Sequence, residues 1–332
     1  MKIRNHIILP AICCALALTL GACGEEKKED VKAEIKAQAE DVLNFSEDGK
    51  TVTGVKDKSI KSVVIPKGVT SIGNNAFLSC KNLTSITIPD SVTSIGTWAF
   101  GNCSNLTSIT IPDSVTSIGR GAFSGCSNLT SITIPDKVTS IGNNAFGVCS
   151  NLTSITIPDS VTSIGDGAFS GVQTVQVSTK NPVFSVDGSG VFINKKEKKL
   201  LYAPRSLSGN YTIPDSVTRI GGNAFSGCKS LTSVTIPESV TSIGDRAFYA
   251  CTALTSVTIG NGVTSIGKSA FSYCTALTSI TIPDSVISIK NAAFQGCSNL
   301  KTLTIPKRFI DADVRLWFTP ERIPSGCKII RK

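Results

Sequence analysis

The chain has 332 residues, 17% of them charged, and a formal net charge of +9 at neutral pH. Its only histidine is His6, so the rest of the chain has no imidazole for a catalytic triad, a general base or a typical zinc site. Lysine and arginine do not alternate with aromatic residues along any face, which argues against nucleic acid as a partner.

Residues 1–22 have the pattern of a signal peptide. Lys2 and Arg4 precede an apolar run over residues 7–20, which is shorter than the ~20 residues needed to cross a bilayer. The run ends in the tetrapeptide LGAC, which resembles the bacterial lipobox. The resemblance implies cleavage before Cys23 and a diacylglyceryl group on its thiol. The alternative is an ordinary signal peptide followed by an incidental cysteine.

Residues 23–42 form a charged segment with few large apolar side chains, which cannot bury enough surface to fold alone. We expect a tether between a lipid on Cys23 and a folded domain. The acidic cluster within residues 25–30 is similar to lipoprotein surface-export signals of Bacteroides-like bacteria. A solvated linker explains the same charges equally well.

From residue 43 to residue 306 the sequence repeats with a period of 23. Ala-Phe pairs mark the period most clearly, and their phenylalanines are Phe77, Phe100, Phe123, Phe146, Phe169, Phe225, Phe248, Phe271 and Phe294. A fixed period of this length predicts a solenoid.

Within one coil, residues 83–88 alternate as a short strand that Pro89 ends, because proline has no N–H for a strand ladder. Residues 92–95 form a second short strand, Phe100 turns inward, and Cys103 closes the circuit. One coil cannot offset the entropy of ordering its own residues, so stability must come from stacking between coils and from terminal caps.

The motif L-x-x-I-x-I resembles a leucine-rich repeat, and the unit I-P-x-x-V-x-x-I-G-x-x-A-F-x-x-C-x-x-L closely resembles the repeats of BspA-like bacterial surface lipoproteins. The resemblance implies a right-handed, β-rich solenoid in the bacterial envelope, at the outer membrane or cell surface, held to the membrane by its lipid alone. It implies an adhesin that binds host matrix proteins, other surface proteins or glycans. A structural envelope spacer is the alternative function.

We expect no enzymatic activity, cofactor or metal, because the sequence shows no convergent catalytic or ligand cluster. The sequence does not indicate the oligomeric state.

The period breaks once, at residues 172–212. Val172, Val175 and Val177 fit the repeat, and an insertion of short strands around a Gly-rich turn follows them. A calcium loop at Asp187 is an alternative that the few neighbouring carboxylates do not support. Residues 307–332 leave the period, and we expect Trp317 and Phe318 to cover the last coil as a C-terminal cap.

Three polar columns each have a structural and a functional interpretation. We expect the cysteines to be free, buried thiols, with disulfides or metal ligation as the alternatives. We expect the turn aspartates to shape turns, with cation binding as the alternative. We expect the threonines to favour strands, with ice binding as the alternative. The Asp-Ser-Val triplets also resemble O-glycosylation signals. The columns are Cys80, Cys103, Cys126, Cys149, Cys228, Cys251, Cys274 and Cys297; Asp90, Asp113, Asp136, Asp159, Asp215 and Asp284; and Thr87, Thr110, Thr133, Thr156, Thr235, Thr258, Thr281 and Thr304.

The residue before each Ala-Phe pair varies between coils and is therefore expected on the surface. Trp98 and Arg246 occupy this position, and Tyr249 and Tyr273 lie in adjacent coils close to Arg246. Aromatic residues and arginine dominate binding hot spots. We therefore predict a ligand patch of Arg246, Tyr249 and Tyr273, with Trp98 as a separate candidate. Packing against neighbouring turns is the alternative explanation.

Overall fold

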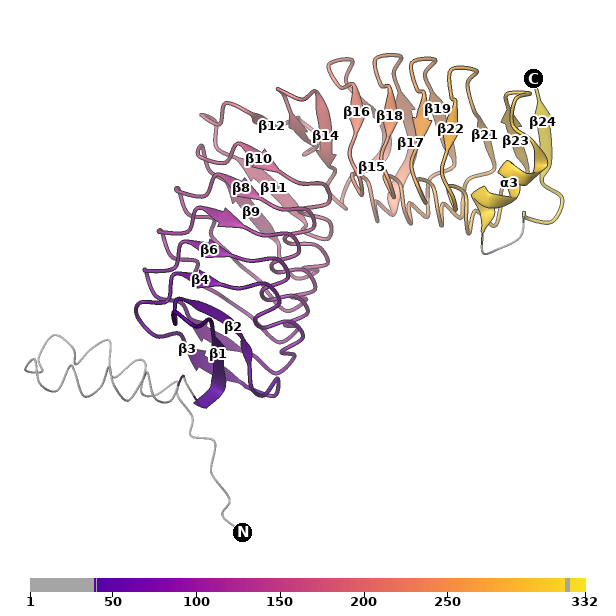
Figure 1. The fold of residues 1–332 in the computed structure, drawn as a ribbon. Helices are drawn as coiled ribbons and strands as arrows, with labels where there is room; N and C mark the ends of the chain where they lie inside the picture. Colours follow the sequence, from indigo (N-terminus) through magenta and orange to yellow (C-terminus); the bar gives the residue numbers. More distant parts are fainter. Residues whose placement is uncertain (1–38, 40, 320–322) are drawn as a thin grey trace, which may run out of the picture.

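The computed structural model describes residues 39, 41–319 and 323–332. The predicted signal peptide, most of the tether and Cys23 lie outside the described residues. The chain forms a β-solenoid of about 12 turns with about 23 residues per turn, as the sequence period predicts (Figure 1).

Each regular coil supplies a first and a second strand position, and strands pair in parallel with the same position one coil away. Ser94 pairs with Ser117 and Ile95 with Ile118, so the register equals one sequence period. The first strands are β3 (Ser62–Val64), β5 (Ser85–Thr87), β9 (Ser154–Ile157), β11 (Thr174–Val177), β15 (Ser208–Thr212), β17 (Ser230–Ile236), β19 (Ser256–Ile259), β21 (Ser279–Thr281) and β23 (Thr302–Ile305). The second strands are β4 (Ser71–Ile72), β6 (Ser94–Ile95), β7 (Ser117–Ile118), β8 (Ser140–Ile141), β10 (Ser163–Ile164), β16 (Arg219–Ile220), β18 (Ser242–Ile243), β20 (Ser265–Ile266) and β22 (Ser288–Ile289).

The core is built from columns of identical side chains. Phe77, Phe100 and Phe123 are fully buried and stack with ring centroids 5.2 and 5.3 Å apart. The cysteines lie beside them. In six of the eight, the buried thiol donates a hydrogen bond to the phenylalanine carbonyl of the preceding coil, as Cys103 does to Phe77 at 3.1 Å. The same bond recurs at Cys126, Cys149, Cys251, Cys274 and Cys297. The expectation of free, buried column cysteines agrees with this arrangement.

The insertion-bearing coil divides the core. It forms an antiparallel meander of β12 (Phe184–Val186), β13 (Phe192–Asn194) and β14 (Lys199–Tyr202), and β14 pairs in parallel with β16 to restart the second-strand sheet. Both carboxylate oxygens of Asp187 are used within this coil. One accepts the backbone N–H groups of Ser189 and Val191, and the other accepts the Tyr211 hydroxyl at 2.7 Å.

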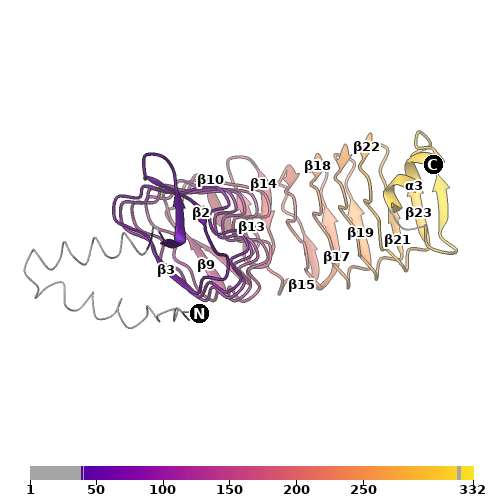
Figure 2. The same ribbon diagram turned by 60° about the horizontal axis from the view of Figure 1, so that its bottom comes forward.

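The buried apolar residues form two clusters, and this coil contributes to both: Phe192 and Tyr202 belong to the cluster of the preceding coils, and Leu200 and Tyr211 to that of the following coils. We call the two halves the first arm (residues 43–177) and the second arm (residues 208–331). The solenoid bends where they meet (Figure 1). Figure 2 shows the first arm nearly end-on while the second arm is seen from its side, so the two arms have different axes.

Both ends of the array are covered. The hairpin of β1 (Leu43–Phe45) and β2 (Thr51–Val55) extends the second-strand sheet through β4. At the other end, helix α3 (Asp311–Phe318) packs Trp317 and Phe318 against the Phe294 ring. The tail then returns to the first-strand sheet, because β24 (Lys328–Arg331) pairs in parallel with β23. The sequence did not predict this last strand.

Candidate functional site

One face of the solenoid, which we call the turn face, is formed by the turns between each second strand and the following cysteine. The residue before each Ala-Phe pair has a positive φ in all nine regular repeats, between 54° and 66°. This first positive-φ column is Asn75, Trp98, Gly121, Asn144, Gly167, Asn223, Arg246, Ser269 and Ala292. Left-handed backbone suits glycine and asparagine but costs about 1–2 kcal/mol for most other residues. Trp98 and Arg246 are therefore held in an unfavourable conformation.

A second positive-φ column precedes the cysteines and runs through Ser79, Asn102, Gly125, Val148, Gly227, Ala250, Tyr273 and Gly296. Tyr273 and Val148 are the bulkiest residues in it, and Val148 is 61% exposed. A β-branched residue with positive φ is a genuine outlier. Strained backbone of this kind gathers at functional sites, which makes the turn face a candidate binding surface.

The structure brings Arg246, Tyr249 and Tyr273 together on the turn face of the second arm. The guanidinium carbon of Arg246 lies 5.9 Å from the centre of the Tyr249 ring, in the range of a cation–π contact. The Tyr249 and Tyr273 rings meet edge to face with centroids 5.5 Å apart. Arg246 is exposed and both tyrosines are half-buried, so the three side chains form one continuous, accessible surface.

Neighbouring residues fix the Tyr273 ring. The side-chain amide of Gln295 donates to the Tyr273 hydroxyl at 3.1 Å. Gly296 in the next coil leaves room for the ring, since a Cβ there would lie 2.5 Å from it. Packing against a neighbouring turn, the predicted alternative, therefore accounts for one side of the ring. The ring is packed on one side and accessible on the other.

Trp98 is separate from this patch and lies on the first arm. Its indole covers two glycines, since a Cβ at Gly101 would lie 2.6 Å from the ring and a Cβ at Gly121 would lie 2.8 Å from it. The indole is half-buried. Local packing onto glycine accounts for much of its surface.

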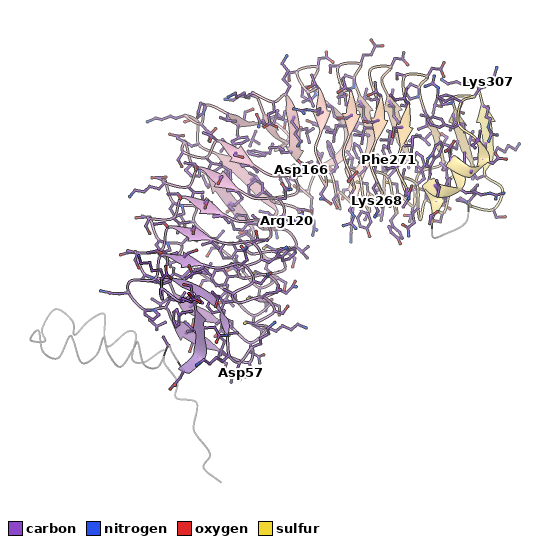
Figure 3. All side chains as sticks on the ribbon, viewed as in Figure 1. Asp57, Arg120, Asp166, Lys268, Phe271 and Lys307 are labelled. Atoms are coloured by element: carbon purple, nitrogen blue, oxygen red, sulfur yellow. The ribbon has the colours of Figure 1, made fainter. Side chains whose placement is uncertain are left out.

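Two hollows flank the Arg246–Tyr249 pair. The first, of about 330 Å³, is lined by residues of both arms, among them Asp166, Arg246 and Lys268. Figure 3 marks Asp166 on the first arm and Lys268 on the second, on the side toward which the solenoid bends. The second hollow, of about 370 Å³, lies beside Tyr249 and is also lined by Arg205 and Lys229.

Charge differs between the two hollows. The first contains acids as well as bases, and the Asp166 carboxylate lies 2.6 Å from the Lys199 ammonium, while Asp245 accepts the backbone N–H of Lys268 at 2.8 Å. The second hollow has Arg205 and Lys229 in its lining and no acidic residue. Only the second is therefore uniformly basic.

Sequence reasoning missed Arg205 and Lys229, because neither occupies a distinctive repeat position. It also missed the left-handed backbone, although a signal was present. Asn75, Gly121, Asn144, Gly167 and Asn223 share one repeat position, and glycine and asparagine are the residues that favour positive φ.

Comparison with known proteins fits the repeat geometry. Residues 55–176 and 199–315 match the BspA type leucine rich repeat region, in six copies. The chain belongs to this BspA-type repeat family. The gap between the two matched segments falls on the insertion-bearing coil where the BspA-type solenoid bends. No curated protein sequence matches the chain.

Solved structures of similar proteins include a bacterial cell surface protein. A leucine rich cell surface protein from Faecalibacterium prausnitzii is 28% identical with a TM-score of 0.67, over 87% of this chain and 92% of that one. The pneumococcal vaccine antigen PcpA is 26% identical with a TM-score of 0.67, over 79% of this chain and 65% of the antigen. A leucine-rich repeat protein from Eubacterium ventriosum is 27% identical with a TM-score of 0.61, over 88% and 93%.

The first-strand face of this BspA-type protein carries the other notable hollow. It measures about 640 Å³ and is lined mainly by serine, threonine and aspartate, including Thr133, Thr156, Asp136 and Asp159. Over the described residues, no group of three or more histidine, cysteine or acidic side chains is placed to hold a metal ion. Within the same residues, no helix has the length and hydrophobicity to span a bilayer.

Proposed function

We propose that this BspA-type protein is displayed on a bacterial surface by a lipid on Cys23 and binds macromolecular partners through its turn face. The partners would be host matrix proteins, other surface proteins or surface glycans. The observation that carries the proposal is the accessible cluster of Arg246, Tyr249 and Tyr273, in which a strained arginine lies over the Tyr249 ring and Tyr249 contacts Tyr273. Aromatic and arginine side chains supply most of the energy at protein interfaces.

Family membership supports a binding role. BspA-type repeat proteins are generally non-enzymatic binding scaffolds, and similar proteins include a cell surface protein and a vaccine antigen. The fold also suits recognition, because a solenoid presents long, regular faces on which individual positions can vary without disturbing the core. The turn face has this character, since its first positive-φ column includes Trp98, Arg246 and Ser269.

A pull-down tests the binding role. The purified protein and a Tyr249→Ser/Tyr273→Ser variant would be immobilised side by side and exposed to extracts of host matrix and of bacterial envelope. We expect partners that the wild type retains and the variant loses, with equal thermal unfolding of the two proteins. Recovery of no partner by either protein would contradict the proposal and favour a structural spacer.

The lipid anchor has its own test, which the lipobox-like LGAC motif suggests. Bacteria that produce the wild type or Cys23→Ala would be grown with a clickable fatty acid. We expect label on the wild type and none on the variant. Equal labelling of both would exclude Cys23 as the acylated residue and leave the binding role untouched.

A further inference from the structure

The basic hollow beside Tyr249 contains an arginine that the insertion-bearing coil places across the bend. Arg205 follows β14, and its guanidinium lies between two glycines of the turn face. A Cβ at Gly171 would lie 3.5 Å from one terminal nitrogen, and a Cβ at Gly227 would lie 3.4 Å from Nε. Because both neighbours lack side chains, the guanidinium is left exposed at the surface.

The cations around this hollow have no acidic partner. Within the described residues, Arg205, Lys229 and Arg246 take part in no ion pair. Asp245, which precedes Arg246 in the chain, has a carboxylate that already accepts the Lys268 backbone N–H at 2.8 Å and lies 3.8 Å from the Lys290 ammonium.

Two buried ionisable groups that interact electrostatically with Arg205, the Cys228 thiol and the Tyr202 hydroxyl, do not supply a counter-charge. Burial raises the pKa of the Cys228 thiol to about 12 and also raises the pKa of the Tyr202 hydroxyl. Both groups are therefore neutral at pH 7. The positive charge of the hollow is left for an external anion.

The walls of the hollow favour a sugar over a peptide. Extended peptides commonly bind by adding a strand to free backbone groups, but the local backbone is already bonded between coils. Gly227 donates to the Tyr249 carbonyl at 2.8 Å, and Ala250 donates to the Ser272 carbonyl at 2.8 Å. What remains accessible is the Tyr249 ring and the cationic side chains. Small-ligand sites of roughly 300–1,000 Å³ use such a combination of flat apolar surface and a few polar groups.

We propose that the hollow between Arg205, Lys229 and Tyr249 binds an acidic sugar of a surface or matrix glycan, a residue that carries a carboxylate or a sulfate. The Tyr249 ring stacks against the sugar, while Arg205 takes the anion in the two-pronged geometry that a guanidinium allows. Lys229 adds a point charge. The inference rests on the proposed binding function and narrows its partner class.

Direct titration with defined oligosaccharides tests the inference. The purified protein would be titrated with a heparin hexasaccharide, which carries sulfate and carboxylate, with a hyaluronan hexasaccharide, which carries carboxylate alone, and with neutral maltohexaose. Poly-glutamate serves as the acidic peptide. We expect binding of at least one acidic oligosaccharide, no binding of maltohexaose, and weaker binding at higher salt. Preference for heparin over hyaluronan would identify sulfate as the recognised anion, and equal binding would identify carboxylate.

Variants locate the site. We expect Arg205→Gln and Tyr249→Ser each to weaken binding at least about tenfold, and Lys229→Gln to weaken it less. Arg120→Gln, an exposed arginine on the turn face of the first arm, is the matched control and should bind as the wild type does (Figure 3). Unfolding curves identify any variant that is misfolded, and the exposed Lys229 provides a site where folding is least at risk.

Three results would overturn the inference: no binding of either acidic oligosaccharide, equal binding by Arg205→Gln and the wild type, or tighter binding of poly-glutamate than of the sugars. The proposed function survives each of them if the pull-down still recovers a partner that depends on Tyr249 and Tyr273. It fails separately if that pull-down recovers nothing.

Discussion

The cysteine columns predict that this protein unfolds in mild alkali. Burial raises the pKa of Cys103, Cys149 and Cys228 from the ordinary value of 9.0 to about 12. In the unfolded chain these thiols ionise near pH 9, whereas in the folded protein they stay protonated. The stability that the protonated thiols contribute is therefore complete below pH 9 and is lost as the pH rises toward 12.

The size of the loss follows from the pKa difference. One pKa unit corresponds to 1.36 kcal/mol, so at pH 10 these three thiols together lower the free energy of unfolding by about 4 kcal/mol. Burial also raises the pKa of Cys126 and Cys274, which adds to the effect. Domains are typically stable by about 5–15 kcal/mol, so we expect cooperative unfolding near pH 10.

The assay is a pH titration with two signals, circular dichroism for the fold and absorbance at 240 nm for thiolate, under reducing conditions. We expect both signals to change together in a Cys327→Ser variant, which lacks the half-buried thiol outside the columns. Thiolate absorbance that rises near pH 9 while the fold persists would refute the assignment of these thiols to a dry core.

Three further predictions concern the core and the turn face. Iodoacetamide should label half-buried Cys327 in the native protein and the eight column cysteines only after denaturation, as read by mass spectrometry. Rapid labelling of the column cysteines in the native protein, or disulfides in most of them, would contradict the prediction of free, buried thiols. Val148→Asn should raise the free energy of unfolding by about 1 kcal/mol because asparagine tolerates positive φ. Ile287→Asn, at a position that is also well exposed but has no positive φ, should give no gain in the same denaturant titration. Gly121→Ala should lower the free energy of unfolding by at least about 1 kcal/mol more than Gly49→Ala, since both glycines have positive φ but only Gly121 lies against the Trp98 ring. Equal losses of free energy of unfolding would show that the indole does not pack on Gly121.

The repeat made the solenoid predictable, because the Phe and Cys positions recur at a fixed period and the structure stacks them in columns. The packing of Trp317 and Phe318 over the last coil could also be predicted, since the open end of a solenoid needs an apolar cover. The end of the regular phenylalanine stack could not be predicted, because the insertion-bearing coil places Phe192 and Tyr202 around Phe169, where the rings meet edge to face instead of stacking.

The candidate site was predicted in part. Proximity in sequence placed Arg246 near Tyr249, but the contact between Tyr249 and Tyr273 depends on which way each ring turns. Arg205 could not be assigned from the sequence, because it reaches the turn face only through the insertion-bearing coil and the two glycines beside it.

The most direct test of a binding turn face is the affinity of alanine variants for a partner that the pull-down recovers. Arg246→Ala, Tyr249→Ala and Tyr273→Ala should each weaken binding by more than about 1 kcal/mol without unfolding the array. Thr133→Ala and Thr156→Ala, in the hollow on the first-strand face, serve as the comparison and should bind as the wild type does. Unchanged affinity in the three turn-face variants, with binding abolished by the threonine substitutions, would place the binding surface on the first-strand face and contradict the account.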